Sequence, residues 1–277
     1  MRSGFILPGG TAREQLELAV LAERCGWDGV FVWEAAYGVD AWSLLAAIAA
    51  STTRVRIGTL LTPLPWRRPW KVASQVATVD QLSQGRVILT VGLGAVSTDL
   101  PKTGEPEALR ERAERLDEGI QLIRTLWQGG TRYQGKHFRY QAGEAPGHAL
   151  NQMVRPVQAR IPIWVVGVWP RRRSMRRVLA CEGIVPQYQV PGRDPAPEDA
   201  RQLREWLSAN GAPGIDLIAE GKTPPDDPAG AAGAVRPWGE AGCSWWLESR
   251  WELPHHSQER LDEVRRRLLA GPPAAGA

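Results

Sequence analysis

The chain has 277 residues, of which 43% are hydrophobic, so it can fill the core of one large α/β domain or two modest ones. No stretch reaches the roughly 20 consecutive apolar residues of a membrane span, and the start MRSGFILPGG is too short and too soon interrupted for a signal peptide. We therefore expect a soluble, cytoplasmic protein that does not act at a membrane. The formal net charge is +4, and two arginine clusters at 171–177 and 265–267 are its visible source, which permits a nucleic-acid partner without requiring one.

Three cysteines, Cys25, Cys181 and Cys243, lie far apart in the chain. They form no Cys-x-x-Cys pair and have no histidine at metal-ligand spacing, so neither a disulfide framework nor a zinc site is indicated. We interpret them as small buried apolar residues.

Short apolar runs alternate with amphipathic stretches along the whole chain, a pattern typical of parallel βαβ units. The predicted strands are residues 4–8, 29–33, 55–61, 86–92, 161–167, 183–187, 215–220 and 243–248. The predicted helices run from the capping box Thr11/Glu14 to Gly26, onward from Asp40, and over 70–83, 106–127, 171–181, 197–209, 228–241 and 257–269. Eight strands alternating with helices predict a (β/α)8 TIM barrel that occupies residues 1–277 as one domain.

The fourth and fifth predicted strands are separated by about 70 residues, which leaves room for more than one helix. One apolar stripe along the helix at 106–127 consists of Leu109, Ala113, Leu116, Ile120, Ile123 and Leu126. The following segment TRYQGKHFRY predicts a hairpin with its turn around Gln134 and Gly135. The stretch from there to Pro162 lacks periodicity, and we expect a loop over the barrel mouth.

The segment VILTVGLGAVST at 87–98 ends a strand on Gly-x-Gly, which is part of a dinucleotide-binding Rossmann fingerprint. That fingerprint needs a third Gly or Ala that opens a helix directly, whereas here Ser97 follows and Pro101 forbids an immediate helix. In a barrel, glycines at the carboxyl end of a strand let a flat ligand approach the backbone. We therefore favour ligand contact at Gly92, Leu93 and Gly94 over a Rossmann fold.

Thirteen tryptophans against four tyrosines and three phenylalanines are unusual, and many lie near predicted strand ends. They fit either an aromatic-lined pocket or ordinary core filling. The candidates for lining a dry substrate pocket are Trp33, Trp42, Trp66, Trp169 and Trp245.

The run RIGTLLTPLPWRRPWKVASQVATVDQLSQGRVILTVGLG at 56–94, with GWDGVFVWE before it and PVQARIPIWVVG and GCSWWLE after it, resembles the luciferase-like monooxygenase family of flavin-dependent oxidoreductases. The resemblance implies a (β/α)8 barrel that binds reduced FMN, or in sister branches the deazaflavin coenzyme F-420, at the carboxyl ends of its strands. It also implies a bulge in the third strand, often with a non-prolyl cis peptide, behind the flavin ring.

The family's cofactor contacts carry over to matching positions of this chain. The positions that match the strand-three bulge are Gly58, Thr59 and Leu60. Ring contacts would come from Gly92, Leu93 and Gly94 at the end of the fourth strand. In the segment GVWPRRRSMRR, Gly167 would allow the phosphate to approach, and Arg171, Arg172 and Arg173 would pair with it. A solvated basic helix face is the alternative for any single arginine.

The chain departs from the family after the second strand, where many relatives carry an Asp-His pair and this sequence has Glu34 followed by Ala35. Glu34 is then the nearest candidate for acid or base catalysis, because a carboxylate among tryptophans can have its pKa raised by desolvation. A salt bridge at the barrel rim is an equally open interpretation. The four histidines, His137, His148, His255 and His256, are weaker candidates.

The leading prediction is a monooxygenase that uses reduced FMN, delivered by a separate flavin reductase, and oxygen to oxygenate a small organic substrate. Hydride transfer with the deazaflavin coenzyme F-420, without oxygen, is the alternative on the same fold. A flavin-binding protein without catalysis and, more distantly, a nucleic-acid binder remain open. Relatives are often homodimers, and specificity is expected in the loops at 95–105, 129–160 and 189–196.

Overall fold

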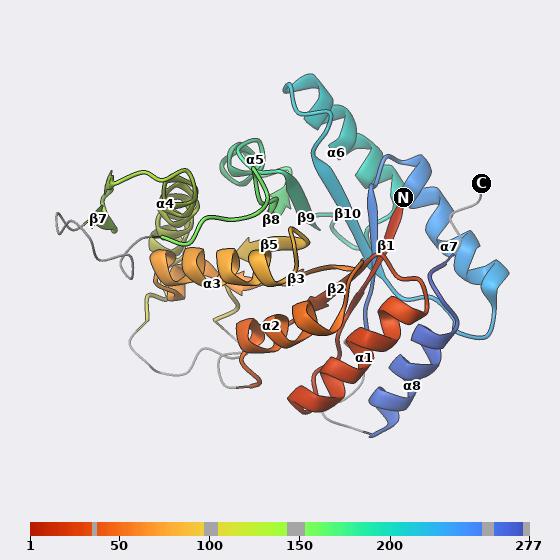
Figure 1. Cartoon of the computed structure of the whole chain (residues 1–277). Helices are drawn as coiled ribbons and strands as arrows, with labels where there is room; N and C mark the ends of the chain where they lie inside the picture. Colours follow the sequence, from red (N-terminus) through yellow and green to blue (C-terminus); the bar gives the residue numbers. More distant parts are fainter. Residues whose placement is uncertain (35–37, 97–104, 143–152, 251–257, 274–277) are drawn as a thin grey trace.

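The structure, a computed structural model, describes residues 1–34, 38–96, 105–142, 153–250 and 258–273 (Figure 1). The strands of the main sheet are β1 (Arg2–Ile6), β2 (Gly29–Val32), β3 (Arg56–Thr59), β4 (Thr62–Pro63), β5 (Val87–Gly92), β8 (Ile163–Trp169), β9 (Gly183–Tyr188), β10 (Asp216–Gly221) and β11 (Trp245–Glu248). The helices are α1 (Ala12–Arg24), α2 (Ala41–Ser51), α3 (Pro69–Leu82), α4 (Leu109–Trp127), α5 (Arg172–Val178), α6 (Pro197–Ala209), α7 (Pro228–Glu240) and α8 (Gln258–Leu269). A 3₁₀ turn, η1 (Leu64–Trp66), precedes α3.

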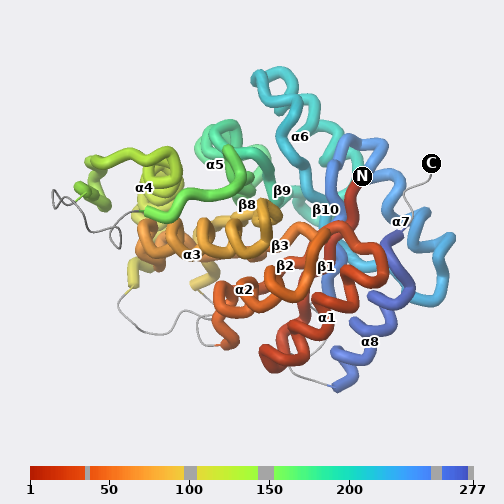
Figure 2. Tube along the Cα trace, viewed as in Figure 1, coloured from red at the N-terminus to blue at the C-terminus, as the bar shows by residue number. Residues whose placement is uncertain are grey.

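The main sheet closes on itself. Among the described residues its nine strands follow the order β3-β2-β1-β11-β10-β9-β8-β5-β4, all in parallel, and β3 also pairs with β5. Because β3 and β4 both pair with β5, they occupy a single position in the barrel and leave eight positions in all. The helices surround this barrel, with α1 beside α8 and α2 beside α3 (Figures 1 and 2). The predicted (β/α)8 barrel is confirmed.

The third predicted strand, 55–61, is interrupted. A cis peptide bond joins Leu60 to Leu61, and pairing resumes only at Thr62. The resemblance placed such a bond within Gly58, Thr59 and Leu60, so it lies at the end of that segment. The interruption sets the short β4 against the carboxyl end of β5.

Aromatic rings fill the part of the barrel interior near the amino ends of β8 and β11. Phe31 stacks on Trp164 with ring centroids 5.3 Å apart, and Trp245 meets both rings edge to face. All three side chains are fully buried, and aliphatic residues such as Ile88 and Leu247 belong to the same cluster. Since successive residues of a strand face opposite sides, this cluster fixes which positions of each strand point inward.

The long helix α4 begins three residues later than predicted, at Leu109. Leu109 itself is 57% exposed, so its place in the predicted buried stripe was wrong, whereas Leu116, Ile120, Ile123 and Leu126 are buried. The first turn of α4 instead buries Arg112.

The predicted hairpin after α4 is present as β6 (Arg132–Gln134) and β7 (Arg139–Gln141), which pair antiparallel at the edge of the molecule (Figure 1). The carboxylate of Glu118 on α4 accepts the backbone N–H groups of Lys136, His137 and Phe138 at 2.8 to 3.0 Å. The hairpin turn is therefore held against α4. None of the described helices is long and apolar enough to cross a bilayer.

Candidate functional site

Barrel enzymes carry their active sites at the carboxyl ends of the strands, so the inward-facing residues at those ends define the candidate site. Alternation from the buried interior cluster places Thr90, Gly92, Val168, Gln187 and Glu220 on that inner side. The Thr90 hydroxyl is buried and has no hydrogen-bond partner among the described residues. The inner rim thus offers apolar, amide, hydroxyl and carboxylate groups.

Glu34 follows β2, and its carboxylate is fully engaged in the wall of the barrel. Arg67 Nη1 donates to Oε1 over 2.5 Å, while the Thr62 hydroxyl and Trp42 Nε1 donate to Oε2 over 2.5 and 3.2 Å. The Thr62 hydroxyl also lies 3.0 Å from that of Thr59. These contacts tie β2 to the segment just after the cis peptide. This is the rim salt bridge that the sequence left open beside an acid–base role.

Burial raises the pKa of the Glu34 carboxyl above its ordinary value. The positive charge of Arg67 and the hydrogen bonds from Thr62 and Trp42 oppose that rise, because they stabilise the ionised form. Arg67 is in turn held by Gln75 of α3, which accepts from Nη2 over 3.0 Å. The carboxylate therefore has a perturbed proton affinity and a rigid environment.

The end of β5 is organised around Gly94, Trp66 and Arg112. Gly94 has a φ of +76°, and a Cβ there would lie 2.3 Å from the Trp66 ring. Arg112 Nη1 donates to the carbonyls of Leu93 and Gly94 over 3.1 and 2.9 Å, and its guanidinium lies 5.8 Å from the Trp66 ring. The missing side chain of Gly94 thus makes room for a tryptophan of this chain, and contact of its backbone with a cofactor stays a prediction.

The other glycines predicted to contact cofactor also lack a Cβ for reasons within the protein. A Cβ on Gly58 would lie 2.1 Å from the carbonyl oxygen of Ile88 on the adjacent strand. On Gly92 it would meet Leu61 at 2.8 Å, and on Gly167 it would meet Ile184 and Val178 at 2.8 Å. Their side-chain directions are occupied, so any ligand contact would come from the backbone.

The arginines after β8 line the barrel's rim where α5 begins. Arg171, Arg172 and Arg173 are all exposed. Arg171 donates to the side chain of Gln189 after β9 over 3.0 Å, and no acidic partner is found for Arg172 or Arg173 within the described residues. Beside them lies a cavity of about 280 Å³ lined by Trp169, Pro170 and Gln189 among others. This rim can hold an anion.

The predicted pocket tryptophans divide into two groups. Trp245 is fully buried at the start of β11 in the lower barrel interior, and Trp42 is 2% exposed and donates to Glu34. Trp245 faces the interior cluster, and Trp42 lies in the first turn of α2 with its indole N–H directed at Glu34. The half-buried ones, near strand ends, are Trp33, Trp66 and Trp169.

The histidines and the second arginine cluster contribute no groups to this rim within the described residues. His137 lies on the hairpin turn, where Nε2 is 2.9 Å from Glu114 of α4; His148, His255 and His256 fall outside the described residues. Arg267 is 1% exposed and donates to the Thr223 hydroxyl and the Gly271 carbonyl. The cluster at 265–267 is therefore partly structural and does not form a continuous basic face.

The closed parallel barrel, with a perturbed carboxylate, a cis peptide and exposed arginines at its strand ends, places the chain among the TIM-barrel proteins. The sequence profile described as luciferase-like monooxygenase matches residues 2–269, and the chain belongs to this family of enzymes.

Relatives named for coenzyme F420 share part of the sequence. The chain is 32% identical over 197 residues to a putative coenzyme F420-dependent oxidoreductase of Mycobacterium tuberculosis, an alignment that covers 69% of this chain and 54% of that protein. It is 42% identical over 126 residues to an F420-dependent glucose-6-phosphate dehydrogenase of Amycolatopsis mediterranei, with 42% of this chain and 38% of that protein covered. The chain thus spans about half or less of the length of these relatives.

Solved structures match over the whole barrel. Monooxygenase RslO1 from Streptomyces bottropensis superposes with a TM-score of 0.74 at 19% identity, covering 97% of this chain and 96% of that one. The coenzyme F420-dependent tetrahydromethanopterin reductase of Methanopyrus kandleri gives 0.72 at 16% identity, with 97% of both chains covered. At these identities the likeness establishes the fold.

Proposed function

We propose that the protein is a deazaflavin-dependent oxidoreductase, which transfers a hydride between coenzyme F420 and a small organic substrate. The observation that carries the proposal is the identity above 30% to proteins named for this coenzyme, in a chain that keeps the strand-end features described above. Because the aligned region covers only part of each relative, the substrate of those relatives is not transferred to this chain.

The residues present fit such a coenzyme at two places. Arg172 and Arg173, together with Arg171 fixed by Gln189, would hold its phosphate, because guanidinium groups without an acidic partner form charge-assisted hydrogen bonds with anions. The backbone of Gly92 to Gly94 and the cis peptide after Leu60 would lie against its ring. The unpartnered Thr90 hydroxyl on the inner side of β5 leaves a polar group at this end of the barrel.

When bound, the coenzyme supplies the hydride acceptor or donor. The chain's own residues would orient it and exclude water. Glu34, through Thr62 and Arg67, fixes the segment that carries the cis peptide. Trp66, packed on Gly94 and Arg112, closes the neighbouring strand end. In this proposal Glu34 acts first as a positioning residue. Because burial raises the pKa of its carboxyl, it is also the nearest candidate to take up or release a proton.

A monooxygenase that uses reduced FMN and oxygen is the second candidate, favoured by the description of the family itself. It would need a separate flavin reductase to deliver the reduced cofactor, and a homodimer is the assembly that the resemblance implies. A flavin-binding protein without catalysis is the third.

Equilibrium titration with F420 and with FMN, each oxidised and reduced, separates these candidates. We expect F420 to bind more tightly and the Arg172→Gln/Arg173→Gln variant to bind it roughly tenfold or more weakly, as for loss of charge-assisted hydrogen bonds. Arg176→Gln, an exposed arginine one turn further along α5, is the matched control and should bind like the parent. Tight binding of FMN alone, with oxygen consumed in substrate turnover, would establish the monooxygenase instead.

A further inference from the structure

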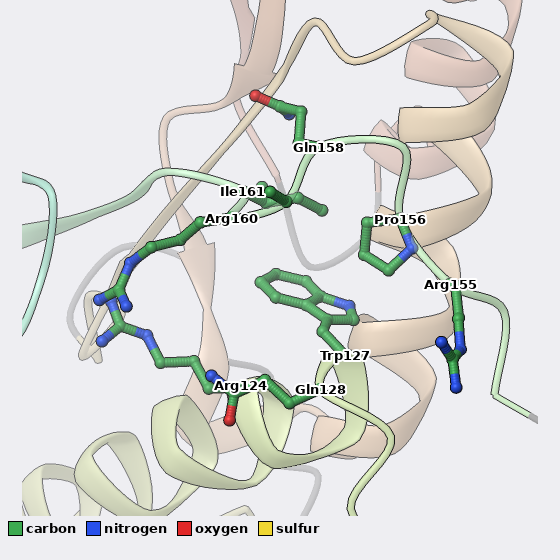
Figure 3. A pocket seen from close by; sticks show the side chains of 9 residues that line it. Arg124, Trp127, Gln128, Arg155, Pro156, Gln158, Arg160 and Ile161 are labelled. Carbon is green, nitrogen blue, oxygen red and sulfur yellow. The ribbon is translucent and has the colours of Figure 1, made fainter.

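A second cavity, of about 200 Å³, lies between the end of α4 and the segment that leads into β8 (Figure 3). Because β8 begins here, the cavity is at the amino ends of the barrel strands, whereas the candidate cofactor site is at their carboxyl ends. Nothing in the proposed function uses it.

One wall of the cavity is apolar and flat. Figure 3 shows the indole ring of Trp127, from the last turn of α4, lying between Pro156 and Ile161 on one side and the helix on the other. Trp127 Nε1 donates to the carbonyl of Ala73 over 3.0 Å, which fixes the ring plane. A fixed indole beside proline and isoleucine suits an aromatic ring.

The rim of the cavity is positively charged. Arg124 and Arg160 project to one side of Trp127, and Arg155 lies on the other side (Figure 3). Arg124 and Arg160 share one carboxylate, that of Glu182, through bonds of 2.5 to 2.9 Å. The guanidinium of Arg155 is exposed and has no acidic partner among the described residues. Positive charge therefore exceeds negative charge around the ring.

The chain segment that carries Arg155 is held in place by α3. Asp80 accepts the backbone N–H groups of Val157 and Gln158 over 2.8 and 2.9 Å, and also the Gln158 side-chain amide over 2.7 Å. Gln81 donates to the carbonyl of Arg155 over 2.9 Å. The cavity wall is thus built without a ligand, so a ligand need not order it on binding.

From these observations we propose that this cavity is a binding site for a small planar organic anion, of the class of monocyclic aromatic carboxylates. The ring would stack on Trp127, and the carboxylate would face Arg155, which has no acid of its own. The volume of about 200 Å³ is below the 300 to 1,000 Å³ of sites for drug-sized ligands, which favours a single ring. The site is independent of the coenzyme and of its proposed identity.

Isothermal titration of the full chain with benzoate tests the proposal, with benzamide as the neutral probe of the same shape. We expect benzoate to bind, benzamide to bind roughly tenfold more weakly or worse, and added salt to weaken benzoate binding. Arg155→Gln should weaken benzoate binding by about tenfold. Arg139→Gln, which removes an exposed arginine of β7 far from the cavity, and the Arg172→Gln/Arg173→Gln variant should leave it unchanged.

Because Arg155 is exposed and its side chain makes no ion pair or hydrogen bond with any described residue, Arg155→Gln should keep the parent's circular dichroism and melting temperature. The variant therefore reports binding and not folding. Absence of benzoate binding at millimolar concentration, equal affinity for benzamide, or unchanged affinity in Arg155→Gln would overturn the proposal. Loss of binding in Arg172→Gln/Arg173→Gln would place benzoate at the other end of the barrel and would overturn it as well.

Discussion

The ion pair between Glu34 and Arg67 yields the sharpest test of how the candidate site is built. Substituting Arg67→Met removes the cation 2.5 Å from a carboxylate whose side chain is 5% exposed. Breaking a buried pair costs about 3 to 5 kcal/mol. Because Arg67 is 27% exposed, and Thr62 and Trp42 still donate to Glu34, we expect about 2 to 3 kcal/mol at neutral pH. For a chain of this size that is roughly a 3 to 6 °C lower Tm.

The loss should depend on pH in a definite direction. The pKa of Glu34 is raised in the folded protein above its ordinary value of 4.5, and loss of Arg67 raises it further. A carboxyl with a raised folded pKa gives stability that is complete below the unfolded value and declines as pH rises toward the folded value. The variant's deficit should therefore be small at pH 5, where Glu34 can take up a proton, and larger at pH 8.

Differential scanning calorimetry of Arg67→Met at several pH values between 5 and 8 measures this deficit. Arg68→Met is the matched control. Arg68 is the neighbouring arginine, it is exposed, and its guanidinium contacts the Trp70 ring at 5.8 Å instead of a carboxylate. Adding Glu34→Gln to Arg67→Met should recover most of the loss at pH 8, since no charge is left buried. A deficit that is the same at pH 5 and pH 8, or no larger than that of Arg68→Met, would refute the reasoning.

Three further outcomes are expected from the same structure. Gly94→Ala puts a Cβ 2.3 Å from the Trp66 ring at a φ of +76°, so urea denaturation should show a loss of about 2 kcal/mol or more, and a loss well below that would contradict the contact. Trp245→Ala should cost about 3 to 5 kcal/mol in the same assay, because it empties the barrel interior; an altered KM with unchanged stability would mean that it lines the substrate pocket. Burial raises the pKa of Cys181 and Cys243 to about 12, so neither should react with a thiol reagent at pH 8 until the protein unfolds, and fast labelling of either would disprove that burial.

The order of strands and helices could be predicted because hydrophobic alternation is a local property of the sequence. The interruption after Leu60 could not be predicted from residue patterns, since RIGTLLTP reads as continuous strand. Only the resemblance to the luciferase-like family implied the cis peptide there. Leu109 shows the limit of periodicity in another way. It continues the spacing of the apolar stripe on α4 but is 57% exposed, because spacing identifies one face of a helix and does not say whether another element covers that face at the first turn.

The glycines of the site were recognisable from sequence, but what surrounds them was not. A glycine signals that a Cβ is excluded or that φ is positive, and it does not say which atom does the excluding. At Gly94 that atom belongs to Trp66, 28 residues earlier in the chain, and at Gly58 it is a backbone oxygen of the next strand. Arg112 was missed for a related reason, because one charged residue in the first turn of a helix usually points to solvent.

Charge shows most directly why a sequence cluster is not a surface patch. Arg177 of the first arginine cluster is paired with Asp117 of α4, and Arg267 of the second is buried against Thr223. Around the cavity at the amino ends of the strands, positive charge instead comes from Arg124, Arg155 and Arg160, which lie in two separate segments of the chain. What brings them together is Asp80, whose carboxylate holds the segment before β8 onto α3. A site of this kind depends on an anchoring contact far along the chain, so it becomes visible only once the fold is known.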